Sequence, residues 1–406
     1  MSQTENKKQL IHVVGGGFHQ VPLVETAKSM GFRVLVTDMY ENPPARAVAD
    51  EFEQIDITHQ EDTLDCARRH KIDYIVTDMT DVGVPTVAYV AENLSLPGIG
   101  YETALRFTNK YIMRSALREK FSAHLPESRY FESVEEALRF LRDPARKGQF
   151  VVKPINSQGS RGVVTLDRRD VNAEEEIYAA FAESQERGVL LEDFISGHEY
   201  SAETFVRDGE VHNLTLTKKY HYAENPCIDE RNTFLGDVAP ELEKSIFDLN
   251  KKIIHALGLP FGNTHAEYMV HGDQIYLIEI AARSAGGSIG SKIIPYLTGF
   301  NCMEALLHAL TGRPYEIHIE DYRQKYAVLK FYNFPPGRVK RIFVNESMLQ
   351  DLLVFTLSPS LAEGETVQPI KGSRDRLGYF VVHGTDREDV LRREKLAESA
   401  VKVEYC

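Results

Sequence analysis

Two glutamates in the second half of the chain are flanked by apolar residues. Glu267 lies in Ala-Glu-Tyr-Met-Val, and Glu279 lies in Tyr-Leu-Ile-Glu-Ile. If Gly272–Gln274 forms a three-residue hairpin loop, the two carboxylates lie directly opposite each other on one face of a sheet. Opposed like charges are destabilising, so a buried pair needs a cation or a shared proton. Magnesium takes one or two carboxylates together with substrate phosphates, and the pair therefore predicts a magnesium site.

Two lysines and a loop of small residues come earlier in the chain. Lys110 begins Lys-Tyr-Ile-Met-Arg, and Lys153 ends the apolar run Phe-Val-Val-Lys-Pro. A lysine at the end of an apolar strand is costly to bury unless an anion meets it. The loop that follows can fold its N–H groups over phosphates, with Ser157, Gln158, Gly159 and Ser160 as its expected contacts. Each feature alone is typical of a surface, but in this order they predict a triphosphate site.

An acidic segment and an arginine complete the set of candidate residues. Glu192 ends an apolar strand and is followed by Asp-Phe-Ile, and Glu199 comes shortly after. Glu192 can accept from an adenine amino group and Glu199 can hold ribose hydroxyls, although a solvated hairpin end explains the segment equally well if it stands alone. Arg283 follows Glu279 by four residues and shares its face if the strand continues. The small residues after Arg283 allow close approach of the backbone to a ligand.

The glycine loop near the N-terminus suggests a different function. Gly15, Gly16 and Gly17 follow an apolar run, and Asp38 comes about 20 residues later, as in a dinucleotide-binding motif. The third glycine of that motif is missing, because position 20 is Gln20. We therefore interpret the loop as a tight turn at the head of a parallel sheet, with a nicotinamide-dependent oxidoreductase as the alternative.

The pattern of apolar runs divides the chain into four parts. Residues 1–108 alternate strand-like runs with amphipathic stretches, which predicts a doubly wound parallel α/β domain with strands that include 52–55, 74–77 and 96–98. Residues 109–191 read as a linker helix and a small α+β lid. Residues 192–320 contain two hairpin patterns and predict an antiparallel catalytic domain. Residues 321–406 form a C-terminal subdomain.

Composition excludes several classes of protein. The 406 residues are 43% hydrophobic and 26% charged, with a formal charge of −13, which argues against a nucleic-acid-binding or anionic-membrane surface. The polar N-terminus lacks the apolar run of a secretion signal, and no stretch is apolar enough to span a bilayer. The four cysteines, Cys66, Cys227, Cys302 and Cys406, are far apart, so we expect reduced thiols in a cytoplasmic protein.

The candidate residues resemble the ATP-grasp superfamily in order and approximate spacing, over about residues 1–310. The resemblance implies an ATP-grasp fold in which Lys110 and Lys153 bind nucleotide phosphates and the loop at 157–162 closes over them. It also implies that the segment of Glu192, Phe194 and Ile195 holds adenine. By the same resemblance, Glu199 belongs to the ATP site, Glu267 and Glu279 carry Mg²⁺, with Mn²⁺ as an alternative, and Arg283 is catalytic.

One position departs from the superfamily pattern. Many members have an asparagine ligand two residues after the second metal glutamate, where this chain has Ala281. The form of the sequence around Glu279 and Arg283, and a stretch near the C-terminus, resemble the L-amino-acid ligase branch, which makes dipeptides and related amides. Candidate substrate residues in that branch pattern are His265, Gly286 and Gly287; the sequence alone leaves open whether His221, Arg231 or His265 lines a substrate pocket.

The function implied by the resemblance is an ATP- and magnesium-dependent ligase. It would activate a small carboxylate as an acyl phosphate and join it to an amine, with amino acids as expected substrates. Other ATP-grasp chemistry, in a bicarbonate-activating carboxylase component or a purine-pathway ligase, is the nearest alternative, and a nucleotide-binding regulatory protein without turnover is another. We expect small-molecule partners, no nucleic acid and no membrane, and a homodimer is allowed.

Overall fold

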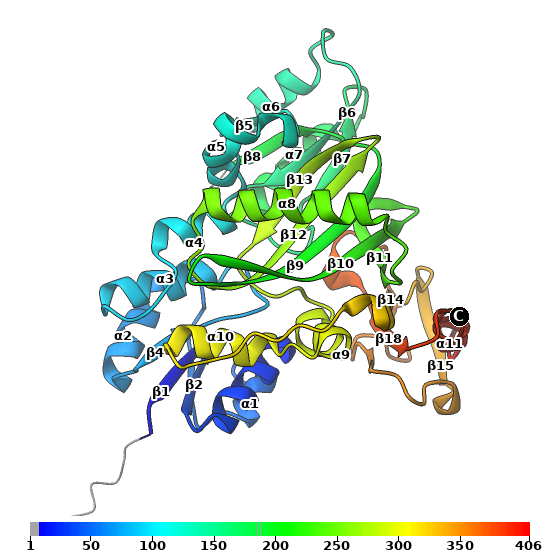
Figure 1. Cartoon of the computed structure of the whole chain (residues 1–406). Coiled ribbons are helices and arrows are strands. Elements are labelled where there is room, and N and C mark those ends of the chain that lie inside the picture. Colours follow the sequence, from blue (N-terminus) through cyan, green and yellow to red (C-terminus); the bar gives the residue numbers. More distant parts are fainter. Residues whose placement is uncertain (1–7, 185, 187) are drawn as a thin grey trace, which may run out of the picture.

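A computed structural model describes residues 8–184, 186 and 188–406 (Figure 1). The first seven residues, most of the polar N-terminal stretch discussed above, lie outside the described residues, as do Gln185 and Arg187. The chain folds around four sheets, and the site lies where elements from three of them meet.

The N-terminal sheet is parallel and has the strand order β3-β2-β1-β4. Its strands are β1 (Leu10–Val14), β2 (Arg33–Asp38), β3 (Glu51–Gln54) and β4 (Tyr74–Val76). Helices α1 (Val21–Ser29), α2 (Gln60–His70), α3 (Val84–Asn93) and α4 (Tyr101–Thr108) accompany it. The expected strand at 96–98 is wrong: this segment has no regular structure and makes a turn before α4.

A second, four-stranded sheet forms the lid, at the top of Figure 1. Its order is β5-β8-β6-β7, with β5 (Ser128–Phe131), β6 (Gln149–Pro154), β7 (Val164–Asp167) and β8 (Val189–Asp193) all antiparallel to their neighbours. Helices α6 (Val134–Leu141) and α7 (Ala173–Glu183) pack on it around an apolar cluster of their own. The helix α5 (Lys110–Phe121) leads into the lid, and its first residue therefore lies at the lid's base.

The largest sheet has eight strands in the order β13-β12-β9-β10-β11-β14-β18-β16. Its first five are β9 (His198–Arg207), β10 (Glu210–Tyr222), β11 (Asn225–Phe234), β12 (Gly262–His271) and β13 (Gln274–Ala281), and α8 (Pro240–Leu257) lies across one face (Figure 1). Beneath α8 the phenol of the fully buried Tyr268 donates to Asn250 Oδ1 at 2.8 Å. Helices α9 (Ile294–Thr298) and α10 (Cys302–Thr311) follow, and α10 packs against α1 of the N-terminal domain.

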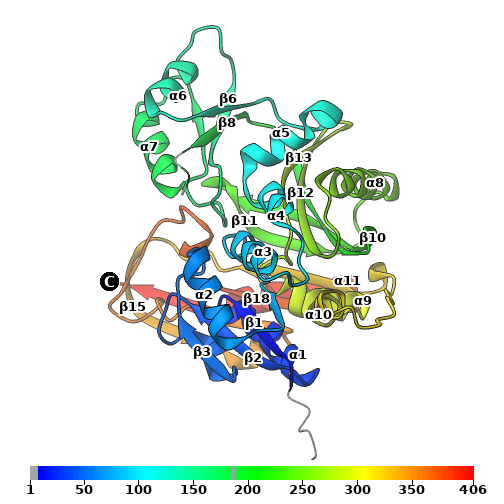
Figure 2. The same cartoon turned by 90° about the vertical axis from the view of Figure 1, so that its left-hand side faces the viewer.

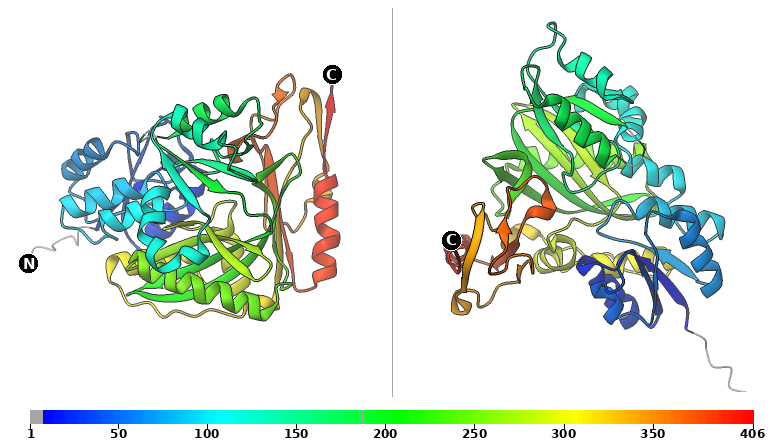
Figure 3. Two further views of the ribbon diagram at one scale, coloured as in Figure 1. Left: turned by 90° about the horizontal axis from the view of Figure 1, so that it is seen from above. Right: turned by 180° about the vertical axis from the view of Figure 1, so that it is seen from behind.

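The chain beyond residue 320, predicted as a C-terminal subdomain, is continuous with the largest sheet. Strands β14 (Tyr326–Phe331), β18 (Gly378–Gly384) and β16 (Val354–Leu357) extend the eight-stranded sheet directly from β11. The reason is that β11 would otherwise present an unpaired edge of N–H and C=O groups. Only β15 (Gly337–Val344), β17 (Thr366–Val367) and β19 (Val401–Tyr405) form a sheet of their own, next to α11 (Arg387–Ser399) (Figure 3).

Figure 2 shows the lid above the N-terminal sheet, with the eight-stranded sheet beside both. No helix of the described residues combines the length and the apolarity that crossing a bilayer requires.

Candidate active site

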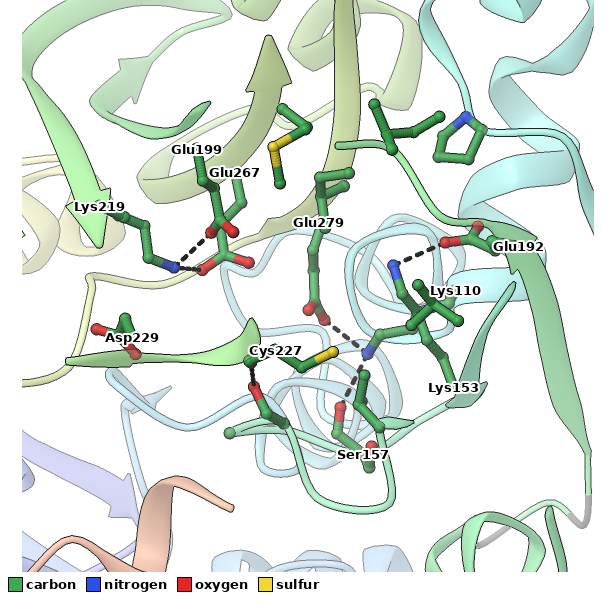
Figure 4. A pocket seen from close by; sticks show the side chains of 18 of the residues that line it. Lys110, Lys153, Ser157, Glu192, Glu199, Lys219, Cys227, Asp229, Glu267 and Glu279 are labelled. Carbon is green, nitrogen blue, oxygen red and sulfur yellow. Dashed lines mark hydrogen bonds and ion pairs between the residues drawn. The ribbon is translucent and has the colours of Figure 1, made fainter. Parts of the chain in front are cut away.

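A pocket lies between the lid sheet and the eight-stranded sheet (Figure 4). Almost all of the predicted ATP, metal, catalytic and substrate residues line it, although they come from five strands, one helix and three loops. They are Lys110, Lys153, Ser157, Gly159, Ser160, Glu192, Phe194, Ile195, Glu199, His265, Glu267, Glu279 and Arg283. The remaining predicted residues, Gln158, Gly286 and Gly287, line a second pocket that adjoins the first.

Lys110 lies at the first position of α5. The side chain of Asn109 caps this helix by accepting from the N–H groups of Tyr111 and Ile112. The ammonium of Lys110 is buried, donates to the carbonyl oxygen of Ser157 at 2.9 Å and pairs with Glu279 at 2.7 Å. The cation thus touches both the phosphate-loop candidate and a metal-ligand candidate.

Lys153 meets the anion that its apolar surroundings require, and that anion is Glu192. The two form an ion pair at 2.7 Å, and Arg114 donates to the other carboxylate oxygen of Glu192 at 2.7 Å. Burial alone would raise the pKa of Glu192, but Arg114 and Lys153 outweigh it and hold the pKa at about 2. Glu192, the carboxylate expected to accept from adenine, is therefore already engaged by Arg114 and Lys153. The neighbouring apolar side chains of Phe194 and Ile195 line the pocket and are available to contact an adenine ring.

Lys219 links the two carboxylates on the other side of the pocket. Its ammonium lies 2.7 Å from Glu199 and 2.6 Å from Glu267, as Figure 4 shows. Burial opposes its charge, but these two carboxylates raise its pKa well above the ordinary value. His221 also reaches Glu199, at 2.8 Å. The ribose-binding candidate and a metal-ligand candidate are therefore held together by one buried cation.

Glu267 and Glu279 lie directly opposite each other on β12 and β13, as the sequence predicted. The predicted loop is wrong: the turn between the strands is Gly272-Asp273, and a bulge next to Glu267 restores the register. Both carboxylates face the pocket, and oxygen donors of this kind fit Mg²⁺. In this structure Lys219 pairs with Glu267 and Lys110 pairs with Glu279. The two carboxylates are therefore suited to a cation that binds together with nucleotide phosphates, because the phosphates can take over the lysines.

His265 and Ala281 face each other across the same two strands, at the position where the superfamily pattern has its third ligand. His265 donates from Nδ1 to Glu203 at 2.6 Å and from Nε2 to Glu267 at 3.2 Å. Burial lowers its pKa, but these carboxylates outweigh burial and raise it to about 9. His265 therefore lies in the pocket as a positively charged neighbour of the metal-ligand candidates.

Arg283 lies just beyond the end of β13, so the expected strand does not continue to it. Asp81, from the loop after β4, holds its guanidinium by two bonds of 2.8 Å each. Asp78 in the same loop accepts from the N–H of Ser284 at 2.7 Å. The N-terminal domain therefore fixes the arginine that the resemblance predicts to be catalytic.

The loop at 157–162 is anchored by three separate parts of the chain. Gln158 accepts from the N–H of Asp81 at 2.7 Å, and Ser160 donates to the carbonyl oxygen of Cys227 on β11 at 2.8 Å. The N–H of Ser373 donates to the carbonyl oxygen of Gly159 at 3.1 Å. Gly159 has φ of +65°, which favours glycine at this turn. The loop is thus closed over the pocket.

The second pocket shares Asp81, Lys219, Glu267 and Arg283 with the first. Arg376 lines it, with its guanidinium carbon 3.6 Å from the ring centre of Phe331 and an ion pair of 2.9 Å to Asp229. Burial would raise the pKa of Asp229, but Arg376 and Lys219 outweigh burial and lower it to about 2. This pocket therefore offers a fixed cation and a fixed anion side by side.

Sequence reasoning missed several residues that build the site, namely Asp81, Arg114, Lys219, Asp229 and Arg376. Asp81 had a usable signal, because ligands bind at the carboxyl ends of parallel strands and Asp81 follows β4. The others stand in ordinary-looking strands, helices and loops. Arg231, considered as a pocket residue, instead pairs with Glu394 on α11. Asp38 accepts from the N–H of Gly16 at 2.7 Å, so it serves the glycine turn rather than a ribose.

Comparison with known proteins defines the class. Residues 147–292 match the family described as ATP-grasp domain, and residues 330–405 match L-amino acid ligase C-terminal domain 2. Among curated relatives, a formate-dependent phosphoribosylglycinamide formyltransferase of Methanocaldococcus jannaschii is 25% identical over 74% of this chain and 76% of its own. A phosphoribosylamine–glycine ligase of Pyrococcus furiosus is 22% identical over 96% and 90%.

Solved structures show the same fold. An L-amino acid ligase from Bacillus licheniformis superposes with a TM-score of 0.77 at 21% identity, covering 98% of this chain and 99% of its own. The biotin carboxylase domain of Hydrogenobacter thermophilus 2-oxoglutarate carboxylase, in complex with MgADP, ADP and bicarbonate, has a TM-score of 0.70 at 15% identity, covering 98% and 90%. The chain has the ATP-grasp fold, residues 147–292 form an ATP-grasp domain, and the protein is an ATP-dependent carbon–nitrogen ligase.

Proposed function

We propose that this ligase joins an amino acid to a second amino acid or another small carboxylate through an acyl phosphate, releasing ADP and phosphate. The observation that carries the proposal is the junction of the two pockets, where Lys219, Glu267 and Arg283 line both. A phosphoryl group leaving a nucleotide in the first pocket is delivered at the mouth of the second.

The residues of the first pocket position the nucleotide. Lys110 and Lys153 supply positive charge for the phosphates, and the closed loop at 157–162 excludes water that would hydrolyse an acyl phosphate. Mg²⁺, held between Glu267 and Glu279, would neutralise phosphate charge. Mn²⁺ would fit the same oxygen donors.

Arg283 serves the transfer itself. Its guanidinium is held in one orientation by Asp81, and a planar fork suits a phosphoryl group with charge spread over several oxygens. The substrate carboxylate attacks the γ-phosphorus, and ADP leaves. The amine then attacks the acyl carbon, loses a proton, and displaces inorganic phosphate.

The second pocket suits an amino acid. A zwitterion carries a carboxylate and an ammonium a few ångströms apart, and Arg376 and Asp229 lie 2.9 Å from each other at the pocket wall. Arg376 would take the carboxylate and Asp229 the ammonium of a substrate that separates the pair. The match of residues 330–405 to an L-amino acid ligase domain supports the same choice over a ribonucleotide or bicarbonate, and so does the fold of the Bacillus licheniformis L-amino acid ligase. The other three relatives named above carry the names of different reactions.

A phosphate-release screen tests the proposal. The full chain is incubated with ATP, Mg²⁺ and amino acids singly and in pairs, and products are identified by mass spectrometry. We expect phosphate release that requires a pair and yields an amide. Release driven by bicarbonate, formate or a ribonucleotide, with no response to amino acids, would assign the enzyme to another ATP-grasp reaction.

A further inference from the structure

Three side chains of types that ligate metals lie close together in the N-terminal domain, between the edge strand β3 and the helix α2. Figure 2 shows these two elements next to each other. Glu53, Cys66 and His70 each present one ligand atom there, and these atoms lie within 4.8 Å of one another. None of them lines the active-site pockets described above.

The secondary structure explains why these side chains meet. Cys66 and His70 are four residues apart on α2 and therefore share one helix face. Glu51 and Glu53 alternate on β3, opposite Leu35 and Thr37 of β2, so both point to the side of the sheet that α2 covers. A helix pair and a strand pair thus converge from two directions, as the ligands of a tetrahedral metal ion do.

His70 has the arrangement of a metal-bound imidazole. Its Nδ1 lies 2.7 Å from Glu51, while its Nε2 faces the carboxylate of Glu53 in close contact. A metal-bound histidine characteristically gives its other nitrogen to a carboxylate, which fixes the ring. Glu51 would hold the ring in this way, leaving Nε2, Glu53 and the Cys66 sulfur for the ion.

A buried histidine next to the cluster is a second, independent observation. His12, on β1, is fully buried on the same side of the sheet. Its Nε2 lies 2.9 Å from the hydroxyl of Thr37, and its Nδ1 has no hydrogen-bond partner among residues 8–184, 186 and 188–406. The apolar core under α2 therefore contains a row of polar side chains on neighbouring strands, His12 on β1, Thr37 on β2 and Glu53 on β3.

We propose that Glu53, Cys66 and His70 bind one Zn²⁺ ion, with a water molecule at the fourth position. Sulfur, nitrogen and carboxylate oxygen together suit Zn²⁺ and not Mg²⁺. Tetrahedral Zn²⁺ with bonds of about 2.0–2.3 Å needs its ligands somewhat closer than 4.8 Å, so binding would require the side chains of Glu53 and His70 to rotate. The ion would tie the edge strand to α2.

Binding must displace a proton. Burial, and next the nearby Glu53, raise the pKa of the Cys66 thiol to about 12, so the metal-free side chain is a neutral thiol. The ion replaces that proton, which passes to solvent, and the thiolate then binds the metal. Arg33 pairs with Glu51 and Arg69 pairs with Glu53, and these cations compete with the ion for the carboxylates. The inference is independent of the proposed ligase reaction.

Cobalt spectroscopy of the metal-free full chain tests the site. Co²⁺ is titrated in the presence of ADP and excess Mg²⁺, which occupy the active-site carboxylates. We expect one equivalent of Co²⁺ to give thiolate charge-transfer absorption and tetrahedral d–d bands, which equimolar Zn²⁺ removes. Cys66→Ser should abolish the charge-transfer band, and His70→Gln should weaken binding at least tenfold.

Cys227→Ser is the matched control, because Cys227 is the cysteine that lines the active-site pocket. Its spectrum should equal that of the unchanged protein, and circular dichroism checks that every variant is folded without metal. The proposal would be overturned if the unchanged protein showed no charge-transfer band. It would also be overturned if the band survived Cys66→Ser or was lost with Cys227→Ser.

Discussion

Arg283 and Asp81 are joined by two hydrogen bonds of 2.8 Å each, although 202 positions separate them in the chain. Their pair connects the end of the catalytic hairpin to the loop after β4. The guanidinium proposed to contact the transferred phosphate is thus oriented by a different domain from the one that carries it.

Arg283→Lys should lower kcat and kcat/KM together by about 30- to 1000-fold, equivalent to roughly 2–4 kcal/mol, because lysine keeps the charge and loses the fork. ATP affinity, measured by calorimetry, should change much less. Arg323→Lys is the control, since Arg323 makes a similar pair with Asp321 on the surface. Loss of ATP binding in proportion to the rate would place Arg283 on the ground-state nucleotide instead.

Asp81→Asn should have a smaller effect on kcat than Arg283→Lys, because it loosens the guanidinium without removing it. Since the two residues act as one unit, the double variant should lose less than the product of the two single effects. The measurement is a double-mutant cycle on kcat/KM. Multiplicative effects would mean that Asp81 acts separately.

Glu279→Gln should lower magnesium-dependent turnover at least 100-fold while the fold remains. The opposed pair alone predicts that stability without ligand stays level or rises. The structure reverses that expectation, because Glu279 pairs with the buried Lys110, and the variant should lose about 1 kcal/mol of unfolding free energy. Urea titration with and without ATP measures this loss. Bound nucleotide should make the difference in unfolding free energy between the two proteins smaller. Asp273→Asn, at the exposed turn of the same hairpin, should change neither quantity.

Gln158→Ala should loosen the closed loop, because it removes the acceptor for the N–H of Asp81. We expect the KM for ATP to rise about tenfold, which corresponds to about 1.4 kcal/mol. Limited proteolysis should cut within 157–162 faster than in the unchanged protein. Gln149→Ala, an exposed glutamine of the same lid, is the control. Equal cleavage of both variants would show that the Asp81 contact does not hold the loop.

Glu192→Gln should destabilise the protein by about 3–5 kcal/mol at pH 7, because it leaves Arg114 and Lys153 buried with no anion. The folded pKa of Glu192, about 2, lies below its ordinary 4.5. Its contribution is therefore present in full above about pH 4.5 and is lost as the pH falls toward 2. Between pH 5 and 3, urea titrations should show the stability gap between the two proteins narrowing by about 2 kcal/mol. Glu175→Gln, exposed on the lid, should show no such gap.

Much of this site could be predicted because its signals are local. The apolar runs around Glu267 and Glu279 define two adjacent strands, and a hairpin brings such strands together whatever the exact turn. Asp81 and Arg114 escaped prediction because their partners are distant: Arg114 donates to the carbonyl oxygen of Ile278, 164 positions away. Lys219 lies in a strand among other charged residues, and only the packed sheet shows that its ammonium is buried between Glu199 and Glu267. The periodicity of a sequence carries no information about contacts between residues that lie this far apart in the chain.

The continuation of the eight-stranded sheet into β14, β18 and β16 limits how this enzyme can be re-engineered. A truncation after residue 320 would expose the edge of β11 and invite aggregation. Exchange of the C-terminal module between homologues must therefore keep the β11–β14 register, in which Arg231 faces Lys330 and Phe234 faces Ala327. Because Arg376 comes two residues before β18, the strand pairing of β14 with β18 also sets the position of a charge in the second pocket. Chimeras made to change substrate choice should consequently be joined in the turns of the sheet formed by β15, β17 and β19, none of whose strands lines either pocket.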